Sequence, residues 1–286
     1  MKIAGAPISW GVCEVPGWGR VLDPASVLAE MASLGLRATE LGPPDYLPAE
    51  PSSLKSLLDA HGLTLVGGFL AVPLHTGDQS TLDEADRVAA LLAAAGAEVL
   101  VLAAATGLDG YDERPALTDA QWRTLVDTAA LVRDRAAAHG LRTALHPHVG
   151  THVERAAEVE RFLADSDLDL CLDTGHLLIG GTDPVDLARR HPDRIGHVHL
   201  KDVRADIAAT VRDGQTGYTA AVQQRMYVPL GDGDVDVAAL VALLRDAGYT
   251  GWYVLEQDTA LGDDIPPDTP VRDTARSLAH LTEITA

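Results

Sequence analysis

The chain has 286 residues, of which 47% are hydrophobic, enough apolar side chains to bury a large core. Its 22 lysines and arginines against 42 aspartates and glutamates give a net charge of −20. This charge repels polyanions, which argues against nucleic acid or an anionic membrane surface as a partner and favours a small neutral substrate.

The sequence also indicates in which cellular compartment the protein is found. The two cysteines, Cys13 and Cys171, fit a reducing environment better than a disulfide framework. No segment has the ~18 uninterrupted apolar residues of a membrane span, and the amino terminus lacks the form of a signal peptide. We therefore expect a cytoplasmic protein, and we leave open whether it is a monomer or a homo-oligomer.

Two kinds of segment alternate along the chain. Apolar runs predict strands over residues 2–10, 37–43, 63–70, 97–105, 141–149, 168–172, 194–203 and 251–258. Amphipathic periodicity and capping signals predict helices over residues 23–35, 52–62, 81–96, 118–140, 153–165, 183–191, 235–248 and 269–284. Eight strands, each followed by a helix, are typical of a closed parallel barrel. We predict an α/β fold with one domain over residues 1–286, a single (β/α)8 TIM barrel.

The longest irregular insert covers residues 203–236, after the seventh predicted strand, and contains GQTG and PLGDGD. A loop of this length in a compact barrel is usually a lid over the substrate or a disordered tip. The sequence leaves both interpretations open, with order expected in the PLGDGD half.

The buried run Leu168 to Leu172 ends abruptly in Asp173-Thr174-Gly175-His176. Catalytic groups of barrel enzymes lie at the carboxyl ends of the strands, on loops held by a rigid sheet. We expect a loop here that carries an acid and a histidine of the functional site.

Three further strand ends carry similar side chains. The fifth strand ends in His146 and His148, the seventh in His197 and His199, and the eighth in Glu256. Residues two apart on a strand share a face, so either histidine of a pair can point toward the barrel axis. Imidazole nitrogen and carboxylate oxygen form the ligand set of divalent ions such as Mn, Co, Fe or Zn. Such groups at four consecutive strand ends predict a metal site, although any one histidine alone would be an ordinary core residue.

These strand ends, together with ELGPPDYLP, LDTGH, HVHLKD, PLGDGD and LEQD, carry a resemblance over nearly the whole chain. It is to the xylose-isomerase-like TIM-barrel superfamily of metal-dependent sugar isomerases and epimerases. Within that superfamily the chain is most similar to the inosose dehydratases, which dehydrate 2-keto-myo-inositol. The resemblance implies a divalent ion, Mn or Co first and Zn, Fe or Mg as alternatives. It also implies four metal ligands, namely His146, Asp173, His199 and Glu256.

The chain departs from the epimerases at the fifth strand, where they place a glutamate ligand. Here that position holds His146, with His148 as the alternative ligand, so Glu256 is the one carboxylate of the epimerase acid–base pair that remains. We expect Glu256 or Glu40 to act as the base on a cyclic polyol ketone. An imidazolium, His176 or His148, would then protonate the departing hydroxyl of an enediolate intermediate. Reprotonation of the same intermediate would instead give isomerisation or epimerisation.

Three side chains are expected to contact the substrate. His75 follows the third strand and Lys201 the seventh, while Trp10 follows the first and would line the pocket or belong to the core. Lys201 would donate to a substrate oxygen or form an ion pair with Asp202. Cys171, in the middle of a predicted strand, is interpreted as a packing residue.

Other functions stay open at this point. Trinuclear zinc endonucleases that act at abasic DNA share the barrel and its histidines, but the acidic charge of this chain counts against them. A sugar-binding barrel without catalysis would result if the metal site were incomplete.

Overall fold

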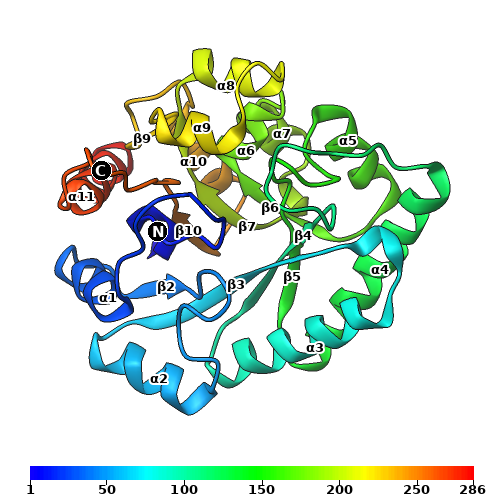
Figure 1. The fold of residues 1–286 in the computed structure, drawn as a ribbon, viewed down its shortest axis with the longest axis horizontal. Helices are drawn as coiled ribbons and strands as arrows, with labels where there is room; N and C mark the ends of the chain where they lie inside the picture. The colour runs from blue at the N-terminus through cyan, green and yellow to red at the C-terminus, as the bar shows by residue number, and fades with distance from the viewer.

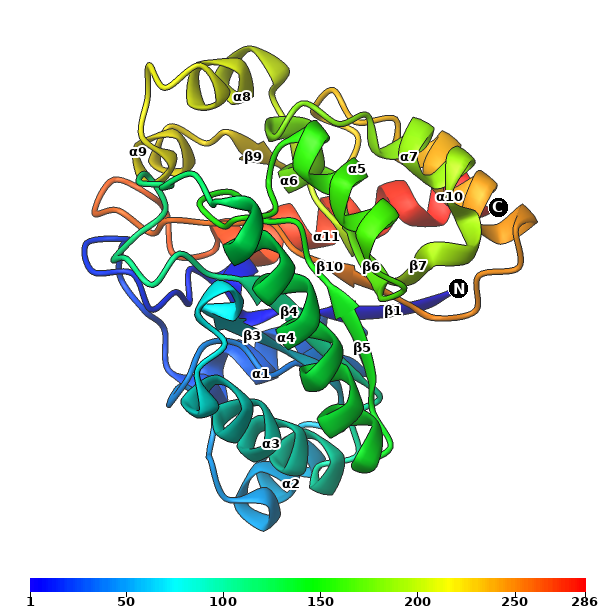
Figure 2. The same ribbon diagram turned by 90° about the vertical axis from the view of Figure 1, so that its right-hand side faces the viewer.

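The computed structural model describes all residues, 1–286. Eight parallel strands close into one barrel, which confirms the predicted (β/α)8 fold. Around the barrel the order is β1 (Lys2–Gly5), β10 (Trp252–Leu255), β7 (Ile195–Leu200), β6 (Asp169–Asp173), β5 (Arg142–Leu145), β4 (Val99–Ala104), β3 (Thr64–Val72) and β2 (Ala38–Glu40). The helices lie on the outside of these strands (Figures 1 and 2).

Most of the main helices begin at a residue whose side chain caps the first turn. They are α1 (Pro24–Ser33), α2 (Pro51–Ala60), α3 (Gln79–Ala94), α4 (Asp119–Ala138), α5 (Ala156–Asp165), α7 (Pro184–Arg190), α10 (Val237–Asp246) and α11 (Thr269–Thr285). Asp23 caps α1 by accepting the backbone N–H of Ser26 at 3.0 Å, and Thr118 forms a capping box with Gln121 at the start of α4. None of the helices is both long and apolar enough to cross a membrane.

Several predicted strands end earlier than expected, and the two that fall shortest stop next to a proline. β1 stops at Gly5 and the 3-10 helix η1 (Pro7–Trp10) follows, while β5 stops at Leu145, two residues before Pro147. Proline has no N–H group to donate to a neighbouring strand, so pairing does not continue through it. His146 and His148 therefore lie on the loop after β5.

The loop expected after β6 is a helix, α6 (Thr174–Ile179). It starts immediately after the strand because Asp173 Oδ1 accepts the backbone N–H groups of Gly175 and His176, both at 2.9 Å. A carboxylate in this N-cap position satisfies donors that the first helical turn leaves free.

Small side chains fill the barrel below the carboxyl ends of the strands. One cluster contains Ala4, Ala6, Ala38, Val66 and Val254. A second contains Val99, Val101, Ala144 and Cys171, with Phe69 packed against it. Small residues fill the lower barrel densely, while the larger polar residues are held at its carboxyl end.

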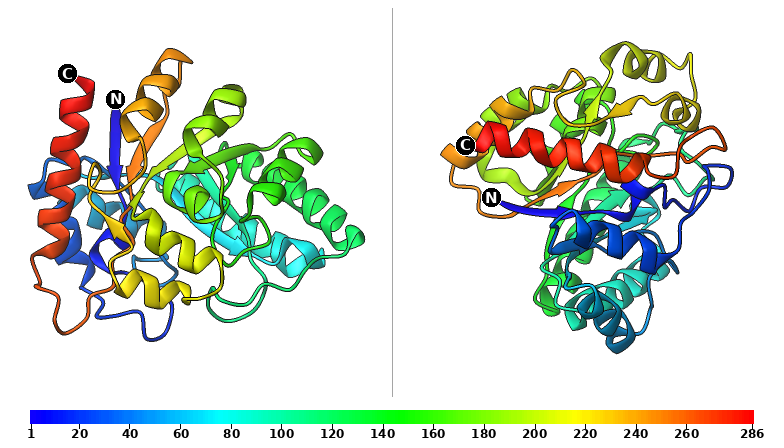
Figure 3. Two further views of the ribbon diagram at one scale, coloured as in Figure 1. Left: turned by 90° about the horizontal axis from the view of Figure 1, so that it is seen from above. Right: turned by 90° about the vertical axis from the view of Figure 1, so that its left-hand side faces the viewer.

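The insert between β7 and α10 is folded, as the lid interpretation expected. It consists of β8 (Asp202–Val203), α8 (Ala205–Arg212), α9 (Tyr218–Gln223) and β9 (Tyr227–Val228), with β8 and β9 antiparallel. The yellow segment of Figure 3 lies beside the carboxyl ends of the strands. The Asp202 carboxylate holds its base by accepting the backbone N–H groups of Val203, Gly231, Gly233 and Val235. The predicted ion pair between Lys201 and Asp202 is therefore wrong.

Candidate functional site

A cavity of about 340 Å³ opens at the carboxyl ends of the barrel strands. Its polar part is lined by side chains from strand ends far apart in the sequence: Glu40, His148, His199, Lys201, Glu256 and Asp258. The volume lies within the range of pockets that bind small molecules, about 300–1,000 Å³.

The four predicted metal ligands lie together beside this cavity. His199 Nδ1 is 3.1 Å from Glu256 Oε2 and 3.5 Å from Asp173 Oδ2, and His146 Nε2 is 3.2 Å from Asp173 Oδ2. The ligand atoms of Asp173, His199 and Glu256 all lie within 4.8 Å of one another, and all three residues are buried or nearly so.

This donor set fits a divalent ion. His199 Nδ1 is buried among carboxylate oxygens yet has no hydrogen-bond partner. Burial by itself would raise the pKa of Asp173, but the nearby Lys201 ammonium and the surrounding histidines hold it well below its usual value. Carboxylate oxygens and imidazole nitrogens that converge in this way are the ligand set of a divalent transition metal.

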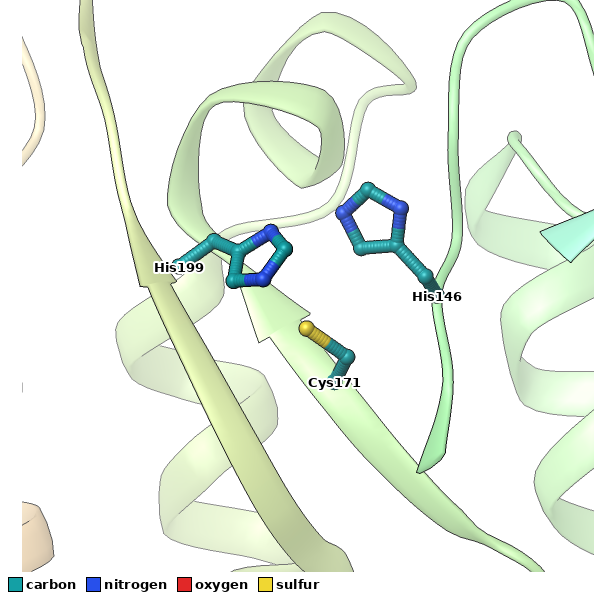
Figure 4. A group of neighbouring side chains, drawn as sticks. All are labelled: His146, Cys171 and His199. Carbon is teal, nitrogen blue, oxygen red and sulfur yellow. The ribbon is translucent and has the colours of Figure 1, made fainter. Parts of the chain in front are cut away.

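A sulfur atom lies close to the same site. Figure 4 shows His146 and His199 pointing toward each other, with Cys171 of β6 between them. Burial raises the pKa of Cys171 to about 12, so the thiol keeps its proton and is a poor ligand, because metals bind the thiolate. Cys171 belongs to the small apolar cluster below the site, as predicted from its place in the strand.

Glu40, from the end of β2, connects to both histidines of β7. Its Oε1 accepts a hydrogen bond from His197 Nε2 at 2.8 Å and another from His199 Nε2 at 3.2 Å. These contacts settle which histidine of the pair faces the ligand cluster, since His199 turns Nδ1 toward Asp173 and Glu256. Carboxylates that accept the second ring N–H of a ligand histidine orient its metal-binding nitrogen.

His148 lines the cavity and His176 does not. The Nδ1–H group of His148 donates to the carbonyl oxygen of Val149 at 2.6 Å, which leaves Nε2 as the nitrogen available to a ligand. The His176 ring stacks on His148 with centroids 3.8 Å apart, and its Nδ1 accepts the Val149 N–H at 3.3 Å. Burial and the neighbouring His146 lower the pKa of His148 to about 3, and burial also lowers the pKa of His176 well below its usual value. Both rings are therefore neutral in this state of the protein.

Lys201 reaches the cavity, as expected for a residue that contacts substrate. Its Nζ lies 2.7 Å from Glu256 Oε2 and 2.5 Å from Asp258 Oδ1. Asp258 also accepts a hydrogen bond from Tyr218 Oη at 2.6 Å, and Tyr218, from the insert, lines the cavity. Sequence reasoning missed both partners. The sequence does contain a signal for Asp258. It lies two residues after Glu256, and residues two apart on a predicted strand point to the same face. Tyr218 has none.

Two residues expected to contact substrate lie elsewhere. Trp10, the last residue of η1, is fully buried, and its Nε1 donates to Glu30 of α1 at 2.8 Å. His75 lies in the 3-10 helix η2 (Leu74–Thr76), with its ring 4.5 Å from that of His152. Neither lines the cavity. Trp10 therefore belongs to the core, one of the two places expected for it, and the expectation that His75 is a pocket residue is corrected.

Comparison with known proteins places the chain among relatives of similar length. The family model described as "Xylose isomerase-like TIM barrel" matches residues 28–283. A protein named inosose dehydratase from Geobacillus kaustophilus (strain HTA426) is 36% identical over 277 residues, which covers 91% of this chain and 89% of the relative. Another of that name, from Erwinia tasmaniensis, is 34% identical over 270 residues and covers 90% of each chain.

Solved structures share the same fold at lower sequence identity. A probable 3-DHS dehydratase from Bacillus anthracis superposes with a TM-score of 0.71 at 17% identity, covering 99% of each chain. This likeness concerns the fold, whereas the family match and the more similar relatives concern descent. The chain thus belongs to the xylose isomerase-like TIM barrel family.

Proposed function

We propose that the protein is a metal-dependent hydro-lyase that removes water from a cyclic polyol ketone, with 2-keto-myo-inositol as the candidate substrate. The observation that carries this proposal is the convergence of Asp173, His199 and Glu256 beside a cavity-facing, neutral His148. The relatives named inosose dehydratase support the choice of substrate. The histidine at position 146, where the epimerases place a glutamate, supports dehydration over epimerisation.

The metal site would be formed by His146, Asp173, His199 and Glu256. A divalent ion bound there, Mn or Co by preference, supplies Lewis acidity toward a substrate carbonyl. In this assignment Glu256 is a metal ligand and not the base. His199 and Lys201 outweigh the effect of burial and lower its pKa to about 2, so the carboxylate is ionised and can bind the ion. Glu40 orients His199 by accepting the hydrogen bond from Nε2. It takes no proton from the substrate and donates none to it.

Lys201 would stabilise the charge that develops on the substrate. Burial disfavours its charged form, but Asp258 and Glu256 raise the pKa of Lys201 well above its usual value, so the ammonium persists. A fixed positive charge in a buried site lowers the energy of an enediolate oxygen more than it would in water.

His148 would carry the proton. Its free Nε2 takes a proton from the carbon next to the carbonyl, which leaves an enediolate. The imidazolium so formed has a low pKa, because burial disfavours its charge, and it gives the proton to the β-hydroxyl, which departs as water. One water is lost and no oxidant is needed.

The test is to incubate the metal-loaded protein with 2-keto-myo-inositol in heavy water, followed by mass spectrometry and ultraviolet absorbance. Dehydration predicts the loss of one water and rising absorbance from a conjugated enolised dione. His148→Gln should stop this turnover and retain the metal, whereas His191→Gln, outside the site, should behave as the unmodified protein. A stereoisomer with solvent deuterium and no loss of water would replace the dehydratase with an isomerase or epimerase.

A further inference from the structure

The cavity reaches both faces of strand β3. Phe69 points toward the barrel axis, where its ring lies 5.7 Å from that of His146. Leu70 and Val72 alternate with Phe69 and so point to the opposite face, toward α3. All three line the same cavity, so the space at the polar site continues around the edge of β3.

The opening exists because β2 is short. The last residue pair between β2 and β3 is Glu40 with Gly67, and Leu41 N–H then donates to Gly67 O at 3.0 Å. Pro43 and Pro44 follow, and proline has no N–H group with which to continue the pairing. β3 runs on to Val72 paired only with β4, and the cavity continues as a slot between this free edge and the loop 41–49.

The walls of this slot are apolar. They are formed by Leu41, Leu47, Leu70, Val72, Val88 and Leu91. The charged side chains at its outer rim are Asp45, Glu84 and Arg87. Arg87 forms an ion pair with Glu84 at 2.6 Å, and Asp45 is exposed to solvent. A polyol hydroxyl placed among these side chains would lose its hydrogen bonds to water without replacement. The hydroxylated ring therefore belongs at the polar end, beside His199 and Glu256.

We infer that the slot binds an apolar alkyl or aryl substituent of the substrate. The substrate class would then be ethers of a cyclic polyol ketone, with the ring at the metal ligands and the substituent along β3. This inference rests on the proposed function for the identity of the ring. It goes beyond it because an unsubstituted polyol leaves the apolar part of the cavity empty.

The test compares 2-keto-myo-inositol with its O-methyl, O-propyl and O-benzyl ethers, each substituted at a ring oxygen outside the reacting keto–hydroxy pair. Dissociation constants are measured by calorimetry on the unmodified, metal-loaded protein. Affinity should rise from methyl to propyl by about fourfold for each buried methylene, and the benzyl ether should also bind more tightly than the parent ketone.

Ala49→Trp provides the structural control, because Ala49 is exposed and lines the slot. A tryptophan there should reduce the affinity ratio between benzyl ether and parent ketone to about one. Ala60→Trp makes the same change at an exposed position at the far end of α2, outside the cavity, and should preserve the ratio.

The outcomes separate the two proposals. Ethers that bind no better than the parent ketone, or an affinity ratio that Ala49→Trp leaves unchanged, would overturn the slot. If the ketone and its ethers bind but none loses water, the proposed reaction is wrong. The binding series still tests whether the slot holds the substituent.

Discussion

The hydrogen bonds of Glu40 indicate whether its carboxylate acts as a base or positions a metal ligand. A base must be free to accept a proton from the substrate, whereas Glu40 Oε1 already accepts from His197 and His199. Those histidines hold the pKa of Glu40 well below its usual value, even though burial raises it. A carboxylate held by two imidazole groups is not free to take a proton from the substrate, and it positions His199 instead.

Glu40→Gln should therefore weaken metal binding by about 10–100-fold, the usual effect of losing such an orienting carboxylate. The dissociation constant for Mn²⁺ can be measured by titration with electron paramagnetic resonance. Glu30→Gln, which changes the acceptor of the Trp10 indole outside the cavity, is the matched control and should leave the affinity unchanged. Lost turnover with normal metal affinity would return Glu40 to the role of a base.

At the scale of elements, the short helix α9 connects the insert to two other loops. The Tyr218 backbone N–H donates to Asp112 Oδ1 at 2.7 Å, and Gln223 Nε2 donates to the Gly17 carbonyl at 3.1 Å. Gly217, just before the helix, allows a close approach to Asp112, since an added Cβ would lie in tight contact with that carboxylate at 3.1 Å. These contacts hold Tyr218 against the cavity.

Asp112→Ala should release the start of α9 without unfolding the barrel. A hydrogen bond to a charged group contributes about 1.5–3 kcal/mol, so amide hydrogen exchange in residues 218–223 should quicken by about tenfold or more. Asp109→Ala changes another exposed carboxylate of the same loop and should have no such effect. Equal exchange rates in the two variants would show that Asp112 does not hold the insert.

At the scale of the whole molecule, the site concentrates negative charge in a chain that is already acidic. Asp173, Glu256, Asp258 and Glu40 are all buried or nearly so, and Lys201 is the single ammonium among them. Like charges held close together oppose folding unless cations balance them. A bound divalent ion would balance them, and it would be absent from the unfolded chain.

Metal binding should consequently stabilise the folded protein. At a free Mn²⁺ concentration of 100 Kd the expected gain is about 2.7 kcal/mol, or a rise in Tm of roughly 5–10 °C for a domain of this size. Differential scanning calorimetry with and without a chelator measures it. Asp173→Ala, which removes one ligand, should abolish the rise. A full rise in this variant would place the stabilising metal elsewhere.

The elements of the barrel were predictable from the sequence because their signals are local. Asp23 and Pro24, two adjacent residues, mark the start of a helix. Asp173 marks the end of a buried apolar run, and this can be recognised without knowing where the strand lies in the fold. The rule that strand carboxyl ends meet at one rim then predicted that Glu256 and one histidine of the pair His197 and His199 lie near Asp173. The family resemblance, and not this rule, selected His199.

Only the tertiary structure decided which atoms meet. Glu40 and His197 are 157 residues apart, so their hydrogen bond depends on barrel closure and strand register, neither of which is written in a local pattern. The place of Tyr218 depends on how a 34-residue insert folds back over the rim (residues 203–236). The slot beside β3 depends on a partner strand that stops short. Local physics thus determined the elements and the ligand types, and long-range geometry decided the roles of Glu40 and His148 and the shape of the cavity.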